Sequence, residues 1–98
     1  MRVSAKSING LLQIFFHPES NDRITPSEKY RMDKKSCFIS LPKGFSLSNL
    51  HPDHFALVAI MLCSPFVGER LELPRPISHE FHQATEVISR FSVGPVDD

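Results

Sequence analysis

The stretch FALVAIMLC, from Phe55 to Cys63, decides the fold, because it is an uninterrupted apolar run of helical length. Pro52 opens the segment, and its fixed φ and missing N–H suit the first turn of a helix. Asp53 follows it, where the positive end of the helix dipole favours a carboxylate. A helix usually ends before the residue that precedes a proline, so Pro65 limits its length. We therefore predict a helix that begins near Pro52 and ends before Pro65.

This predicted helix is apolar on every side. One face holds Phe55, Val58, Ala59 and Leu62, and the other holds Leu57, Ile60, Met61 and Ser64. Such a helix needs cover from more than one direction, and each large apolar side chain gains about 1.5–3 kcal/mol from full burial. We therefore expect a partner to cover part of the helix and of the turn after it. The candidate interaction surface consists of Leu57, Ile60, Met61, Phe66 and Val67.

The N-terminal region is predicted to form a β-hairpin over residues 3–8 and 11–16. Asn9-Gly10 lies between these segments, and both central residues of a type I′ turn need positive φ, which Asn and Gly tolerate. Residues 17–28 are rich in proline, serine, asparagine and aspartate and have few apolar residues. We predict a mobile loop there.

Two further extended segments are predicted before the helix, over residues 29–32 and 36–41. In the second, Cys37, Ile39 and Leu41 recur at every other position and therefore fall on one side of the chain. This period of two is typical of a half-buried antiparallel strand.

After the first helix, residues 69–73 alternate between polar and apolar and predict a short strand that Pro74 and Pro76 end. Ser78 is a good N-cap for a second helix. The apolar stripe of this helix is expected to consist of Phe81, Ala84, Ile88 and Phe91. Residues 92–98 predict a linker or tail, or a last edge strand. The whole pattern indicates an α+β fold, an antiparallel sheet of about four or five strands with two helices on one face.

Length, charge and composition narrow the class of protein. The 98 residues suffice for a single small domain, residues 1–98. The net charge is zero, whereas a nucleic-acid-binding protein needs a basic surplus, so we expect no nucleic acid as partner. The apolar run is about half of the roughly 20 residues that span a bilayer, and the N-terminus lacks a signal-peptide pattern. We expect no membrane association and a cytoplasmic location. Cys37 and Cys63 lack metal-ligand spacing and predict two buried thiols.

Four histidines form two pairs with a spacing of three residues, and each pair lies at a predicted helix start. Such a pair shares a helix face and could ligate a metal, although a helix N-terminus disfavours a cation. The same helix starts, together with nearby arginines, could instead hold an anion. In the third interpretation His51 caps the first helix and the other histidines face solvent. The candidate anion or metal ligands are His51, His54, His79, His82, Arg70 and Arg75.

No catalytic constellation is recognisable in the sequence. The glycines are scattered at positions 10, 44, 68 and 94, so there is no glycine-rich phosphate loop. Both cysteines lie in apolar segments, which raise the pKa of a thiol, and no serine lies in a nucleophile elbow. We therefore predict that the chain is not an enzyme, with no catalytic residues and no cofactor.

Four phrases of the sequence carry a resemblance to a known family: HPDHFAL at 51–57, PFVGERLELP at 65–74, PISHEF at 76–81 and VGPVD at 93–97. They resemble the leader region of bacterial proteins in which a small domain precedes an ATP-pyrophosphatase-type (PP-loop) domain, related to 7-cyano-7-deazaguanine synthase and other adenine-nucleotide alpha hydrolases. The resemblance covers about residues 41–97. In that family the nucleotide chemistry belongs to a Ser-Gly-Gly-x-Asp-Ser loop, which this sequence lacks, so no catalytic residue is carried over.

Two functions from different classes follow. In the first, the chain is an N-terminal fragment of a longer protein. It would be a non-catalytic interaction or substrate-gating domain of a nucleotide-dependent enzyme, with a downstream domain of the same polypeptide or a second copy as its partner. In the second, it is a small free-standing protein that binds an anion or a metal through the histidines at the two helix starts.

Overall fold

The computed structural model describes residues 1–29 and 31–97. Within that part of the chain the elements are, in order, β1 (Arg2–Ile8), β2 (Leu11–His17), β3 (Ser36–Ser40), the 3-10 helix η1 (Leu47–Asn49), α1 (Pro52–Cys63), β4 (Arg70–Ile77), α2 (His79–Ile88) and β5 (Ser92–Val96). The last of these shows that residues 92–96 form an edge strand, one of the two alternatives that the sequence left open.

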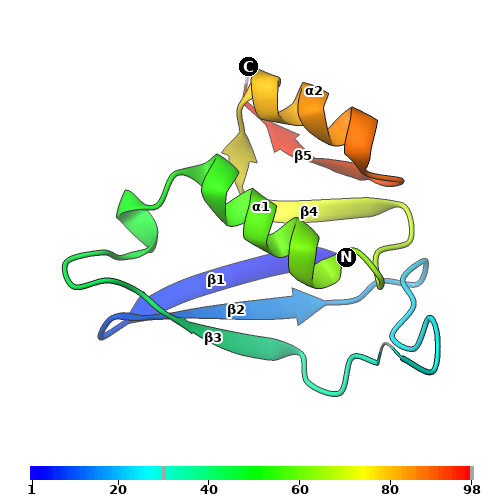
Figure 1. Ribbon diagram of the computed structural model, residues 1–98, viewed down its shortest axis with the longest axis horizontal. Helices are drawn as coiled ribbons and strands as arrows, with labels where there is room; N and C mark the ends of the chain where they lie inside the picture. Colours follow the sequence, from blue (N-terminus) through cyan, green and yellow to red (C-terminus); the bar gives the residue numbers. More distant parts are fainter. Residues whose placement is uncertain (30, 98) are drawn as a thin grey trace.

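The five strands form one mixed sheet in the order β3-β2-β1-β4-β5 (Figure 1). The pairs β1–β2 and β2–β3 are antiparallel, whereas β1–β4 and β4–β5 are parallel. The α+β class is thus confirmed, and the expectation of a purely antiparallel sheet is wrong. The physical reason is that α1 and α2 each link two strands, and a helical crossover brings the chain back in the same direction.

The two crossovers also place the helices. From β3 to β4 and then to β5, the chain advances in one direction across the sheet. Right-handed crossovers in the same direction put both helices on the same face, as Figure 1 shows. Because α1 must pass over β2 and β1 to reach β4, it crosses the middle of the sheet, and α2 lies beside it near β5. The described residues place no helix on the opposite face of the sheet, which we call the open face.

The hairpin and β3 form as the sequence predicts. Asn9 and Gly10 adopt positive φ values of 52° and 79°, and Ile8 pairs with Leu11 on either side of the turn. By contrast, the extended segment expected at 29–32 is not a strand at Lys29, Arg31 or Met32, and Tyr30 lies outside the described residues. These residues belong instead to the long connection between β2 and β3.

Strand β4 is longer than predicted, because it continues through Pro74 and Pro76 to Ile77. A proline cannot donate to a ladder and is tolerated where the pairing is irregular. The register of β4 with β5 shifts between Glu72 and Ile77. Both prolines therefore lie in the part of β4 whose pairing with β5 is irregular.

Helix α1 has the predicted bounds but not the predicted faces. Its buried residues are Phe55, Ala56, Ala59, Ile60 and Cys63. Leu62, expected on the same face as Phe55, is 41% exposed, and Ile60 is buried. The sequence suggested two broad apolar faces. In the structure, α1 buries one narrower stripe, which packs against the sheet. Val67, expected at the surface, is also fully buried.

Helix α2 begins at the predicted N-cap, where the Ser78 Oγ accepts a hydrogen bond from the Phe81 N–H at 3.1 Å. Its expected stripe is only half right. Phe81 packs against the core and Phe91 belongs to it, but Ala84 and Ile88 are exposed and Thr85 is buried. The stripe assumed helical spacing as far as Phe91. The helix ends at Ile88, so the direction of the buried Phe91 side chain is set by the turn into β5.

One core joins the helices, the sheet and the turn after α1. Its buried apolar members are Met1, Val3, Leu12, Ile14, Phe16, Phe55, Ala56, Ala59, Ile60, Cys63, Val67, Leu71, Leu73, Ile77, Phe91 and Val93. Residues of β3 border this core and are only partly buried, because no helix lies over that edge of the sheet (Figure 1).

Candidate functional site

The two helix starts are joined by the Asp53 side chain. The His51 Nδ1 accepts a hydrogen bond from the Asp53 N–H at 3.0 Å and so caps α1. The Asp53 carboxylate in turn accepts hydrogen bonds from the Ser78 N–H at 2.8 Å and from the Ser78 Oγ at 2.6 Å. The sequence placed a histidine or serine at each start, and the structure adds the bridge between them.

This bridge decides what the helix starts can bind. Burial raises the pKa of the Asp53 carboxyl, but the hydrogen bonds from Ser78 and the nearby imidazoles of His51 and His54 outweigh this effect, so the pKa lies below its usual value. Asp53 is therefore an internal anion at the start of α2, where an external phosphate would have to bind. An incoming phosphate would meet a negative charge at that position.

The histidines do not assemble a metal site in the described part of the chain. The rings of His51 and His54 lie 5.8 Å apart between centroids, and the His82 Nδ1 is 3.5 Å from the Glu86 Oε1. His79 is exposed at the first position of α2. Among residues 1–29 and 31–97, no three His, Cys, Asp or Glu side chains are grouped so that they could hold an ion.

The two candidate arginines lie in different places. The Arg70 Nε pairs with the Glu72 Oε2 at 2.6 Å on the open face of the sheet. The Arg75 Nη2 donates to the Leu50 carbonyl at 2.6 Å, just before α1. The Arg75 Nε is buried and has no hydrogen-bond partner among the residues that the structure describes. The structure therefore does not bring the arginines and the four histidines together at one ligand.

Neither cysteine is prepared for nucleophilic catalysis. Burial raises the pKa of the Cys37 thiol, and burial together with the Cys37 thiol raises the pKa of Cys63 to about 12. Only the thiolate is an effective nucleophile. Both cysteines are free, and Cys63 belongs to the core.

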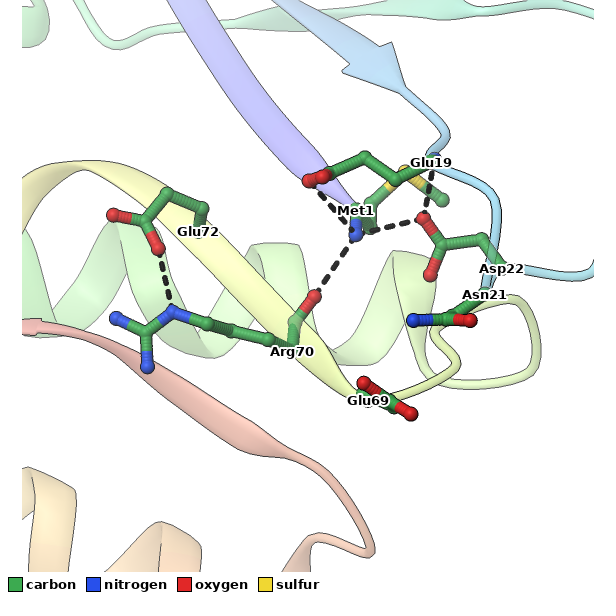
Figure 2. Close-up of a pocket in the computed structure, with 7 residues that line it drawn as sticks. All are labelled: Met1, Glu19, Asn21, Asp22, Glu69, Arg70 and Glu72. Atoms are coloured by element: carbon green, nitrogen blue, oxygen red, sulfur yellow. Dashed lines mark hydrogen bonds and ion pairs between the residues drawn. The ribbon is translucent and has the colours of Figure 1, made fainter.

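A pocket that the sequence did not reveal surrounds the α-ammonium group of Met1 (Figure 2). Its volume is about 370 Å³, and acidic side chains dominate its lining. The Met1 ammonium is 2.7 Å from the Asp22 Oδ2 and 3.6 Å from the Glu19 Oε1, and it donates to the Arg70 carbonyl at 2.9 Å. The pocket is therefore already engaged by a cation of the chain itself.

Asp22 is the centre of this arrangement. Its side chain is only 1% exposed, and its Oδ1 accepts a hydrogen bond from the Gly68 N–H at 2.8 Å. Burial alone would raise the pKa of Asp22, but the hydrogen bonds from the Met1 ammonium and from the backbone of Glu19 and Gly68 outweigh it and lower the pKa. Thus the loop after β2, expected to be mobile, has a polar anchor. No periodic pattern in the sequence connects positions 1, 22 and 68, so only the folded chain could reveal it.

No family model matches this chain, and no curated protein or solved structure is significantly similar to it. The function is therefore argued from the geometry. Within the described residues, no helix is long and apolar enough to cross a bilayer.

The helical layer leaves large apolar side chains in water. On α1, Leu57 is 45% exposed and Met61 73%. On α2, Val87 is 86% exposed and Ile88 70%. Phe66 is half-buried, whereas Ile60 and Val67 belong to the core. The exposed set is thus partly the predicted one. It extends to α2, where Ile88 belongs to the stripe that the sequence predicts to be covered. We call Leu57, Met61, Leu62, Val87 and Ile88 the exposed helical residues.

Proposed function

We propose that this chain is a cytoplasmic, non-catalytic N-terminal interaction or substrate-gating domain that docks through its helical layer on a nucleotide-dependent catalytic domain. The observation that carries the proposal is that large apolar side chains on both α1 and α2, the exposed helical residues, lie in water. The resemblance of residues 41–97 to leaders of PP-loop proteins indicates the kind of domain that would cover them.

Energetics support a docking role for these side chains. Large apolar side chains that are exposed together on one helix are a feature of interaction sites, and α1 and α2 each carry more than one. Each of these side chains gains on the order of 1 kcal/mol when its remaining exposed part is covered. Together they can contribute several kcal/mol to an interface, which the association entropy partly offsets.

The chemistry at the candidate sites also favours a non-catalytic role. The Asp53 carboxylate at the helix starts already accepts a hydrogen bond from Ser78. The Met1 ammonium already forms an ion pair with Asp22 in the acidic pocket. The thiol pKa values are raised. The Asp53 and Asp22 carboxylates are therefore engaged in holding the fold together, and the chain itself is not expected to hydrolyse ATP.

The test titrates an ATP-pyrophosphatase-type domain, encoded in the same reading frame or operon, into the isotope-labelled chain. Amide resonances of α1 and α2 are expected to shift and saturate. Met61→Lys and Val87→Lys should weaken the interaction at least about tenfold, because a buried ammonium is costly. Ile24→Lys is the matched control, since Ile24 is 50% exposed in the loop after β2. The proposal fails if no resonance of the helices shifts, or if the isolated chain hydrolyses ATP.

A further inference from the structure

The sheet has two edges, β3 and β5, and the backbone of β3 is open to pairing (Figure 1). Leu41 donates to the Gly10 carbonyl and Phe16 donates to the Lys35 carbonyl, each at 2.8 Å. In an antiparallel ladder the hydrogen-bonded positions alternate. The backbone N–H and C=O groups of the odd-numbered residues from 35 to 41 therefore point toward β2. The N–H and C=O groups of Ser36, Phe38 and Ser40 point away from the sheet.

The two edges are protected to different degrees. Strand β5 contains Gly94-Pro95, and the proline has no N–H to offer to another strand. Strand β3 has the sequence SCFIS, with no proline and no charged residue, and its pairing with β2 runs without a bulge. By the usual criteria β3 is the edge at which a further strand can add.

Both faces of β3 present apolar side chains beside this edge. On the open face, Phe38 is 62% exposed and lines a cavity of about 200 Å³ with Ile8 and Leu11. On the helical face, Cys37 lines a second cavity, of about 330 Å³. Its other apolar lining residues are Phe16, Met32, Leu62 and Phe66, and its charged ones are Arg31, Asp33 and Lys34. A strand that pairs with β3 would therefore cover apolar surface on two sides.

We propose that β3 pairs in antiparallel fashion with β3 of a second copy of this chain, in a register centred on Phe38. The pairing would join the two five-stranded sheets into one continuous sheet. This inference goes beyond the proposed function, because it rests on the backbone of the sheet edge, and of the exposed helical residues only Leu62 lies beside that edge.

The sequence of β3 is self-complementary in this register. Phe38 pairs with Phe38 of the second copy, and Ser36 pairs with Ser40 of the second copy. These are the residues whose backbone groups point outward, so about six main-chain hydrogen bonds can form. A two-fold axis requires such self-complementarity, since each contact occurs twice. No other register uses all three outward-facing residues of both strands.

Side chains support the same register. The two Phe38 rings become a cross-strand aromatic pair on the open face, and Cys37 faces Ile39 of the second copy on the helical face. The occupant that this edge fits best, in backbone register and in side-chain pairing, is therefore its own copy.

The first test measures the molar mass of the chain by sedimentation equilibrium over a wide concentration range. A reversible monomer–dimer equilibrium is expected. Phe38→Lys sets two ammonium groups opposite each other at the two-fold axis and should raise the dimer dissociation constant by more than about tenfold. Ile24→Lys and Met61→Lys should leave that constant unchanged, which separates this interface from the docking of the helical layer. Amide spectra verify that each variant is folded.

The second test locates the axis by cross-linking in a Cys37→Ser background. The Phe38→Cys variant should form a disulfide-linked dimer under mild oxidation, because position 38 faces itself. The Ser36→Cys variant is the matched control and should not cross-link with itself, because position 36 faces position 40. A chain that is monomeric at all concentrations overturns the proposal. So does a Phe38→Lys variant that remains dimeric, or equal cross-linking at positions 36 and 38.

Discussion

The antiparallel half of the sheet, β1-β2-β3, and its parallel half, β4-β5, are held together by contacts of different range. In the antiparallel half, Asn9-Gly10 sets the register of β1 with β2 through a turn of two residues. In the parallel half, β4 reaches β1 only after α1 has crossed the sheet, and the register that joins them is Arg2 opposite Glu72. Local turn chemistry suffices for the β1–β2 pair, whereas the junction of β1 with β4 depends on contacts between distant residues.

The contacts of Met1 with Asp22 and Arg70, and of Asp22 with Gly68, join the two halves; we call them the seam. The Met1 ammonium binds the Asp22 carboxylate and the Arg70 carbonyl, and Asp22 also accepts from the Gly68 N–H. The start of β1, the loop after β2 and the entry to β4 therefore meet at a few polar atoms (Figure 2). Because few contacts carry this seam, single substitutions there should cost more than substitutions in the hairpin.

The largest effect is expected from Gly68→Ala. A Cβ at this position would overlap the backbone carbonyl of Asn21. Backbone cannot move aside as a flexible side chain can, so the loop after β2 would have to separate from the entry to β4. We expect a loss of about 2–4 kcal/mol in the free energy of unfolding, measured by urea denaturation.

Gly94→Ala is the matched control for this prediction. A Cβ there would meet only the end of the Arg70 side chain, which is half-exposed and can move. Its cost should be clearly smaller than that of Gly68→Ala. Equal losses for the two variants would show that the seam is not the sensitive contact between the halves.

The Asp22→Asn variant should have the second-largest effect, about 1.5–3 kcal/mol, because it removes the charge that pairs with the Met1 ammonium in a buried position. Its amide can still accept one hydrogen bond, which limits the loss. Thermal unfolding should show the loss of stability. The substitution should accelerate amide hydrogen exchange more at β4 than in the β1–β2 hairpin. Uniformly faster exchange would contradict a special role for the seam.

The pH dependence of stability sharpens the same point. The pKa of Asp22 in the folded chain lies below the usual value of 3.8. Its contribution is therefore fully present above the pKa of the unfolded chain and is lost as the pH falls through the lower folded value. Stability should fall as the pH drops below about 4, and the slope should be shallower in Asp22→Asn. The pKa of Asp53 is also lowered, so Asp53 should still contribute a pH dependence of stability in that variant.

The smallest effect is expected in the hairpin. Gly10→Ala forces a residue with a Cβ to a φ of 79° and should cost about 1 kcal/mol. Gly10→Asn is the control, because asparagine tolerates positive φ, and it should cost less. If Gly10→Ala proved as harmful as Gly68→Ala, the contrast between the local hairpin and the long-range junction of β1 with β4 would not hold.

Local signals account for what was predictable. Pro52 and Pro65 mark the bounds of α1, Ser78 caps α2, and Asn9-Gly10 forms the hairpin turn. Each of these depends on residues close in sequence. The same reasoning found His51 at the start of α1 but not the bond between Asp53 and Ser78, because no periodicity relates residues on different elements.

The amino-acid sequence alone thus determined the helices, the hairpin turn and the half-buried face of β3, since turns, caps and periodicity act over a few residues. Only the tertiary structure decided the parallel pairing of β4 and β5, the path of β4 through its prolines and the side of α2 that is buried. It also decided that Asp22 would meet the Met1 ammonium. These features depend on how distant elements share one core, and the free energy of that packing outweighs local preference at Thr85 and Ile88.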